Sequence, residues 1–203
     1  MHKGDVIRYF DQLAPAWDAN QVRNEQRLKR ILDYADIREG VSVLDVACGT
    51  GVLLGDYLDR GAAAVTAVDL SPAMIARAKE KFSDPRIQLL AADIEELEFS
   101  RAFDRCVIYN AFPHFPEPER LLRHLASQLV PGGRLTVAHG MSRADINRHH
   151  TGSACRVSIG LLSETALAEL MRVWMDVDVV ESSDEIYVVS GRKRAEPCAE
   201  GET

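Results

Sequence analysis

The chain has no apolar run long enough to cross a membrane, and no apolar core follows its polar N-terminus as in a signal peptide. Its four cysteines are far apart and form no C-x-x-C pair, which argues against a disulfide framework or a zinc knuckle. Free thiols of this kind are typical of a reducing cytoplasm. The 31 acidic residues outnumber the 24 Lys and Arg residues, so the net charge of -7 disfavours broad, phosphate-driven binding of nucleic acid.

The 203 residues also contain no internal repeat and no linker that would separate two globular halves. This length is most simply one domain with a substantial core. We predict an N-terminal helical lid or cap over residues 1–39, the main domain over residues 40–193, and a disordered polar tail over residues 194–203.

The chain is organised around residues 41–54, where an apolar run leads into an acid, two glycines and a helical pattern. Val43, Leu44 and Val46 predict a short buried strand of the kind found in parallel sheets. Gly49 and Gly51 allow a sharp turn that leaves room for a ligand against the main chain. The N-terminus of the following helix favours an anionic group.

This loop differs from a dinucleotide-binding fingerprint. The G-x-G-x-x-G pattern requires a third glycine, and Leu54 stands in its place. Asp45, directly before the loop, is a poor neighbour for a pyrophosphate but suits a ligand that carries a cationic amino group. The residues therefore argue against a nicotinamide dinucleotide.

The stretch Leu-Asp-Val-Ala-Cys-Gly-Thr-Gly resembles the first motif of class I S-adenosylmethionine (SAM) methyltransferases. The resemblance extends over about residues 40–190 and includes the acids after the next two strands and a Pro-Gly-Gly turn. It implies SAM as the cofactor. It also implies a set of cofactor-binding residues in the loop: Asp45, Ala47, Cys48, Gly49, Thr50 and Gly51.

A second acid ends the predicted strand 64–69. Asp69 lies about twenty residues after the glycine loop, where a carboxylate accepts hydrogen bonds from both ribose hydroxyls in nucleotide-binding βαβ units. The alternative role is that of a helix N-cap, but Ser71, directly before Pro72, already suits that position. The resemblance implies that Leu70 and Met74 flank the adenine.

A third acid, Asp93, follows the predicted strand 87–92. Its carboxylate can accept a hydrogen bond from the adenine amino group, and the backbone N–H of Ile94 completes the pair. Asp93 can equally be a plain turn residue. The presence of Asp45 and Asp69 favours the adenine role.

Two histidines follow strands at the edge where ligands bind in such sheets. Asn110 ends the predicted strand 103–110 and is expected to face the methyl donor, with His114 on the acceptor side. His139 ends the predicted strand 134–139. Either histidine could act as a general base for an acceptor that loses a proton, His114 being the first candidate. A hydrogen-bonded structural role is at least as plausible for each alone.

The segment 9–18 resembles the entry segment of small-molecule methyltransferases related to the ubiquinone and menaquinone C-methyltransferases, where it covers the site. Phe10 and Trp17 are thus predicted substrate contacts, or they simply cover the domain edge. Phe112 is a further predicted substrate contact. Arg143 could pair with a substrate carboxylate or lie on the surface.

A metal site is not predicted. His139, His149, His150 and Cys155 offer metal-binding atoms, but their spacing matches no standard site.

The remaining pattern predicts helices over 117–130 and 163–175, a tight turn at 131–133, and a closing strand pair over 177–180 and 185–190. With the alternating strands and helices before it, this indicates an α/β fold. The resemblance implies a three-layer Rossmann-like methyltransferase fold, with a mainly parallel seven-stranded sheet and a C-terminal antiparallel strand.

The predicted function is transfer of the SAM methyl group to a small-molecule acceptor by in-line displacement. The alternatives are a nicotinamide-dependent Rossmann oxidoreductase and a non-catalytic SAM-binding module. A nucleic-acid acceptor is disfavoured by the acidic balance, and a homodimer is left open.

Overall fold

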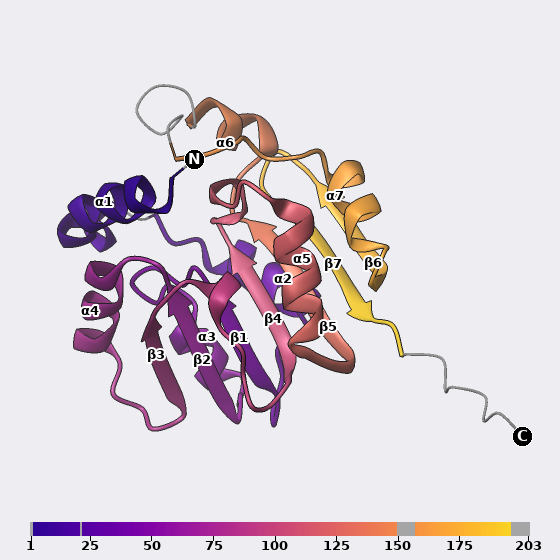
Figure 1. The fold of residues 1–203 in the computed structure, drawn as a ribbon, viewed down its shortest axis with the longest axis horizontal. Coiled ribbons are helices and arrows are strands. Elements are labelled where there is room, and N and C mark those ends of the chain that lie inside the picture. Colours follow the sequence, from indigo (N-terminus) through magenta and orange to yellow (C-terminus); the bar gives the residue numbers. More distant parts are fainter. Residues whose placement is uncertain (1, 21, 150–156, 196–203) are drawn as a thin grey trace, which may run out of the picture.

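The protein folds around a seven-stranded sheet with the order β3-β2-β1-β4-β5-β7-β6 (Figure 1). The computed structural model describes residues 2–20, 22–149 and 157–195. The strands are β1 (Ser42–Val46), β2 (Ala64–Asp69), β3 (Ile87–Ala91), β4 (Phe103–Tyr109), β5 (Leu129–His139), β6 (Met175–Ser182) and β7 (Tyr187–Lys193). β1 to β5 pair with one another in parallel, and β7 is antiparallel to both β5 and β6. The predicted mainly parallel sheet with a C-terminal antiparallel strand is confirmed.

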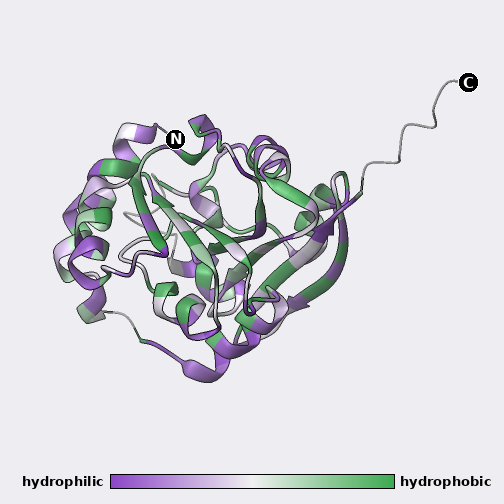
Figure 2. Cartoon of the chain, turned by 90° about the horizontal axis from the view of Figure 1, so that it is seen from below, coloured by the Kyte–Doolittle hydropathy of each residue, from purple (hydrophilic) through white to green (hydrophobic). Residues whose placement is uncertain are grey.

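Helices cover both faces of this sheet. They are α1 (Lys3–Leu13), α2 (Glu25–Tyr34), α3 (Leu54–Asp59), α4 (Pro72–Lys81), α5 (Pro118–Ser127), α6 (Arg143–His149) and α7 (Glu164–Met171), with short 3-10 turns such as η3 (Ile94–Glu96). Apolar side chains of α5 and α7 join the core on one face, and those of α2 and α3 join the core on the other. The result is the predicted three-layer α/β architecture. Figure 2 shows hydrophobic segments in the central strands and hydrophilic ones in many outer loops.

β1 is an interior strand of the sheet, and both of its faces are covered. Leu44 and Val46 pack into the core under α5, and Val43 packs into the core under α3, all without solvent exposure. This explains why the strand has no alternation of apolar and polar residues. Its register with β2 and β4 brings the carboxyl ends of the three strands to the same edge.

The C-terminal part differs in detail from the prediction. The helix expected over 163–175 is shorter, because α7 ends at Met171 and the chain has already entered β6 at Met175. The predicted turn at 131–133 lies inside β5, which starts at Leu129 and has an irregularity in its pairing with β4 before Arg134. Local turn residues here interrupt a strand and do not end it, because pairing with β4 resumes beyond them.

The N-terminal region contains two helices with different positions. α2 contributes Leu28 and Leu32 to the core beside β1, whereas α1 packs against α4 near the carboxyl edge of the sheet. In Figure 1, α1 lies beside α4, and α6 lies above the sheet. The division of the chain at residue 39 stays a prediction. Within the described residues, no helix is long and apolar enough to span a membrane.

Candidate functional site

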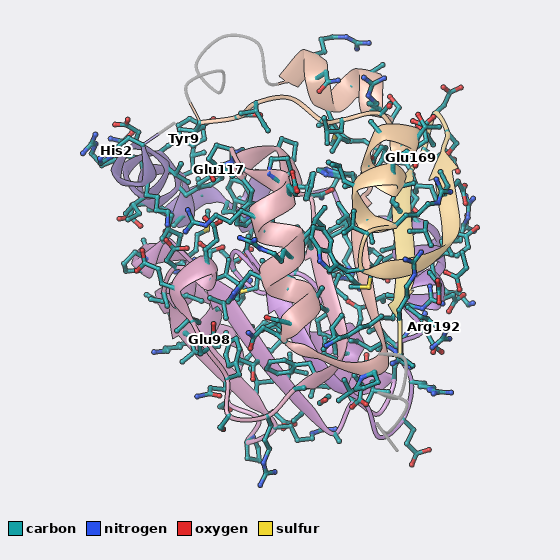
Figure 3. The ribbon with its side chains drawn as sticks, turned by 45° about the vertical axis from the view of Figure 1, so that its right-hand side comes forward. His2, Tyr9, Glu98, Glu117, Glu169 and Arg192 are labelled. Carbon is teal, nitrogen blue, oxygen red and sulfur yellow. The ribbon has the colours of Figure 1, made fainter. Side chains whose placement is uncertain are left out.

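A cavity opens at the carboxyl ends of β1, β2, β3 and β4, and α1 closes it from above. In Figure 3, Tyr9 of α1 and Glu117, directly before α5, lie in the same upper part of the view. The lining residues are Lys3, Val6, Ile7, Phe10, Trp17, Ala47, Gly49, Val68, Asp69, Leu70, Ser71, Met74, Ala92, Asp93, Ile94, Glu95, Asn110, Ala111, His114, Phe115 and Pro116. The cavity thus gathers most of the residues that the sequence singled out, although they come from five separate parts of the chain.

The glycine loop follows β1 and presents its main chain to the cavity through Ala47 and Gly49. Gly51 lies behind it, with a φ of +87°. A Cβ atom there would lie 2.7 Å from Cδ1 of the buried Leu54. Glycine is therefore required at this position both by the backbone conformation and by the packing of α3.

Asp69 organises the loops after β1 and β2. Its carboxylate accepts hydrogen bonds of 2.8 Å from the backbone N–H groups of Gly49 and Ser71. Burial raises the pKa of Asp69 above its ordinary value, although these two hydrogen bonds oppose the rise. Ser71 caps α4 by accepting from the N–H of Met74, as predicted. The N-cap alternative for Asp69 is thereby excluded, and its carboxylate faces the cavity.

Asp93 lines the cavity beyond β3. One carboxylate oxygen accepts from the backbone N–H of Glu95 at 3.0 Å and so caps η3. The other oxygen contacts the ammonium group of Lys3 on α1. The capping bond shows the turn role directly, and the adenine role of Asp93 stays a prediction.

Asp45 lies behind the glycine loop and does not line the cavity. Its side chain is only 2% exposed. Burial, reinforced by the negative charge of Asp69, raises the pKa of Asp45 to about 8, and Tyr57 opposes the shift. Cys48, Thr50 and Gly51 also lie outside the lining of the cavity.

The end of β4 contributes two polar residues to the lining. Asn110 has a left-handed backbone with φ +55°, and its side-chain oxygen accepts from the N–H of Gly140 at 2.9 Å. The Nδ1 atom of His114 lies 2.6 Å from the carbonyl oxygen of Val157. A carbonyl oxygen can only accept, so Nδ1 carries the proton and Nε2 of the neutral ring is the basic nitrogen.

Three further predicted residues, outside the glycine loop, do not line the cavity. Phe112 is buried in the core under α5 because the 3-10 turn after β4 directs it inward. His139 is 2% exposed, since it pairs across the sheet with Tyr187 and packs edge-to-face on that ring at 5.9 Å. Arg143 donates to the carbonyl oxygen of Leu161 at 3.1 Å.

An aromatic group covers the cavity on the side of His114. The ring of Phe10 packs edge-on against Trp17 and His114, with centroid distances of 5.8 and 5.0 Å. Trp17 Nε1 would lie 3.8 Å from a Cβ atom on Gly49, so the indole lies over the glycine loop. Phe10 and Trp17 therefore cover the cavity itself.

Sequence reasoning missed several other residues of the lining, among them Lys3 and Phe115. Phe115 could have been inferred from the sequence, because it directly follows His114. Lys3 carried no signal, because nothing in the sequence indicates that the start of α1 reaches the loop after β3.

Among the residues that the structure describes, no group of three or more His, Cys, Asp or Glu side chains could hold a metal ion. His150 and Cys155, which the sequence analysis considered as ligands, lie outside the described residues, as do residues 196–203 of the predicted tail.

Comparisons with known proteins agree on one family. A family model described as a methyltransferase domain matches residues 43–133. A demethylmenaquinone methyltransferase from Paenarthrobacter aurescens is 30% identical over 190 residues, which cover 86% of this chain and 74% of that protein. A malonyl-acyl-carrier-protein O-methyltransferase from Priestia megaterium is 32% identical over 170 residues, but this chain covers only 62% of its length.

The fold is also shared with solved structures. The N-methyltransferase NodS from Bradyrhizobium japonicum, solved with S-adenosyl-L-homocysteine, superposes with a TM-score of 0.72 over 92% of this chain and 97% of that chain. The sequence identity between the two is 14%, so this likeness concerns the fold alone.

Proposed function

The chain belongs to the SAM-dependent methyltransferases, and from this membership we propose that it transfers the SAM methyl group to a small, largely apolar acceptor. The observation that carries the proposal is the meeting of Gly49, Asp69 and Asp93 in one cavity under Phe10 and Trp17. These residues come from the loops after β1, β2 and β3, and each offers a group that suits a different part of the cofactor.

The cavity suits SAM chemically. Asp69 would hold the ribose hydroxyls, since a carboxylate accepts from two donors at once. Asp93 would accept from the adenine amino group, with the N–H of Ile94 beside it and Leu70 and Met74 against the ring. Ala47, Gly49 and Asn110 would line the methionine part. Asp45 would attract the amino group of the cofactor from behind the glycine loop. Cys48, Thr50 and Gly51 would support that loop.

When bound, the cofactor supplies a methyl group that is already activated by its positive sulfur. The protein then has to align the acceptor and exclude water. Phe10 and Trp17 of the N-terminal cover, together with Phe115, form an apolar wall suited to this task. The names of the relatives give demethylmenaquinone and malonyl-acyl-carrier protein as methyl acceptors. The apolar wall favours an acceptor of the first kind.

His114 is the general base in this proposal. It lines the cavity beside Phe10, and the carbonyl oxygen of Val157 fixes the orientation of its ring through Nδ1. His139 and Arg143 are not part of the proposed site, because other side chains and backbone groups hold them away from the cavity.

Replacing His114 by glutamine is expected to lower turnover by about 10- to 100-fold, because proton removal from the acceptor loses its base. The affinity for SAM should change by no more than about 3-fold. His124→Gln on α5 is the matched control, since His124 lies outside the cavity lining. Unchanged turnover in His114→Gln would remove His114 as the base.

The proposed function is tested first by isothermal titration with SAM, S-adenosylhomocysteine and NADH. Micromolar binding of the first two without binding of NADH would support it and justify a screen of aromatic and apolar acceptors. NADH binding in their place would favour the nicotinamide alternative. SAM binding without turnover of any acceptor would favour a non-catalytic module. The absence of a nucleic-acid partner, a homodimer and a cytoplasmic location stay predictions.

A further inference from the structure

Lys3 places a positive charge inside the cavity at its β3 end. Its ammonium group contacts Oδ2 of Asp93 and lies 3.7 Å from a carboxylate oxygen of Glu95 and 3.6 Å from one of Glu96. The lysine side chain remains 45% exposed. The pKa of Lys3 is raised, first by the hydrogen bond to Asp93, so the group stays charged at neutral pH.

The other contacts that hold the N-terminal segment over the cavity are of a different kind. Asp11 accepts hydrogen bonds from the Ser71 hydroxyl and, at 3.2 Å, from the N–H of Ala73. Asp18 pairs with Lys81 at 2.8 Å and accepts from the hydroxyl of Thr50. These contacts close the cover without using a group assigned to the ligand, whereas Lys3 uses the Asp93 carboxylate.

Each oxygen of the Asp93 carboxylate already accepts from one donor. One oxygen accepts from the N–H of Glu95, and the other accepts from Lys3. The adenine amino group is also a donor and would approach the same oxygen from within the cavity. Two donors with positive hydrogens repel each other when they share one acceptor, and the ammonium group carries a full charge.

We propose that Lys3 sets the cofactor affinity of the site by competing with the adenine amino group for Asp93. This inference rests on the proposed function, since it takes Asp93 as the adenine contact. Without the cofactor, the Lys3 ammonium group occupies the place of the adenine amino group at Asp93. When the cofactor binds, Lys3 leaves Asp93 and pairs with the neighbouring glutamates.

The movement of Lys3 away from Asp93 costs little free energy, because Glu96 is already within reach as another partner. Glu96 is 73% exposed and lies on the outer side of the cluster, whereas Glu95 is nearly buried and also pairs with Arg120 at 3.4 Å. Lys3 keeps an ion pair when it moves to Glu96. An exposed lysine contact of this kind is worth little, so we expect its removal to tighten binding by about 3- to 10-fold.

The experiment compares the full chain with Lys3→Met by titration with S-adenosylhomocysteine, which has no sulfonium charge. We expect about 3- to 10-fold tighter binding to the variant. Added salt should tighten binding to the parent, because it screens the Lys3–Asp93 pair, but not to the variant. Arg8→Met is the matched control: Arg8 lies on the same helix, pairs with Asp5 and does not line the cavity.

A second ligand separates competition at Asp93 from a general change in charge. S-inosylhomocysteine lacks the adenine amino group, so its affinity should gain less than about 2-fold from Lys3→Met. An equal gain for both ligands, or unchanged or weaker binding of S-adenosylhomocysteine to the variant, would overturn the inference. Failure of the parent chain to bind S-adenosylhomocysteine at all would instead overturn the proposed function.

Discussion

Replacing Asp69 by asparagine is expected to weaken SAM binding by about 100- to 1000-fold, the loss expected for two charge-assisted hydrogen bonds. Asp69 faces the cavity and already accepts from the N–H groups of Gly49 and Ser71. An asparagine offers only one acceptor oxygen, so the ribose hydroxyls and these two N–H groups can no longer all be satisfied.

Isothermal titration with SAM checks this expectation. Asparagine is preferred to alanine because alanine would leave both N–H groups without their acceptor, and thermal melting should be recorded for each variant. Asp84→Asn is the control, since Asp84 lies outside the cavity lining and contacts Arg86. Unchanged affinity in Asp69→Asn would contradict the ribose role.

Replacing Asp45 by asparagine is expected to make the chain less sensitive to rising pH. An unfolded Asp45 ionises near pH 3.8, and the folded one at about pH 8 because of burial and the nearby Asp69. Between these values the folded chain holds more protons than the unfolded chain. The free energy of unfolding of the parent therefore falls as the pH rises, and the full penalty is reached above pH 8.

Asparagine does not ionise, so the variant lacks this penalty. From pH 5 to pH 8, the stability difference should shift in favour of Asp45→Asn by roughly 4 kcal/mol. Urea unfolding without cofactor at the two pH values measures the shift. Asp104→Asn is the control: although burial alone would raise the pKa of Asp104, hydrogen bonds from Ser42 hold it below 3.8, so Asp104 is ionised in both states and its stability difference should not shift between pH 5 and pH 8. If the difference in free energy of unfolding between Asp45→Asn and the parent did not change with pH, Asp45 would be ionised in the folded chain.

The Asp45 variant also tests the proposed cofactor role of this residue. Because Asp45 lies behind the loop, its effect on SAM binding should be smaller than that of Asp69, about 10-fold. A stabilised variant with unchanged affinity would restrict Asp45 to supporting the loop.

The sequence predicted the sheet well because its strands are short apolar runs followed by chemically distinctive residues. Val43 to Val46, the glycines after them and the acids after β2 and β3 lie within single local segments. The strand order then brings Gly49, Asp69 and Asp93 together automatically, because the carboxyl ends of parallel neighbours share one edge.

Residues whose role depends on packing were harder to predict. Phe112 and His114 are two positions apart, yet one enters the core and the other lines the cavity. His139 ends a strand as predicted, but the antiparallel β7 brings Tyr187 against it. A local pattern indicates that a residue stands at a strand end, but the side to which it turns depends on the neighbouring elements.

The sequence by itself determined the family, the three-layer architecture and the acids of the proposed cofactor site, because these depend on motifs and periodicities within a few residues of each other. Only the tertiary structure decided which side chains share the cavity. It placed Lys3 on Asp93, Trp17 over Gly49, and Asp45 behind the loop. The contacts of Lys3 and Trp17 join residues 32 or more positions apart, and the burial of Asp45 depends on the elements packed around it, so all three arise only when the whole chain has folded.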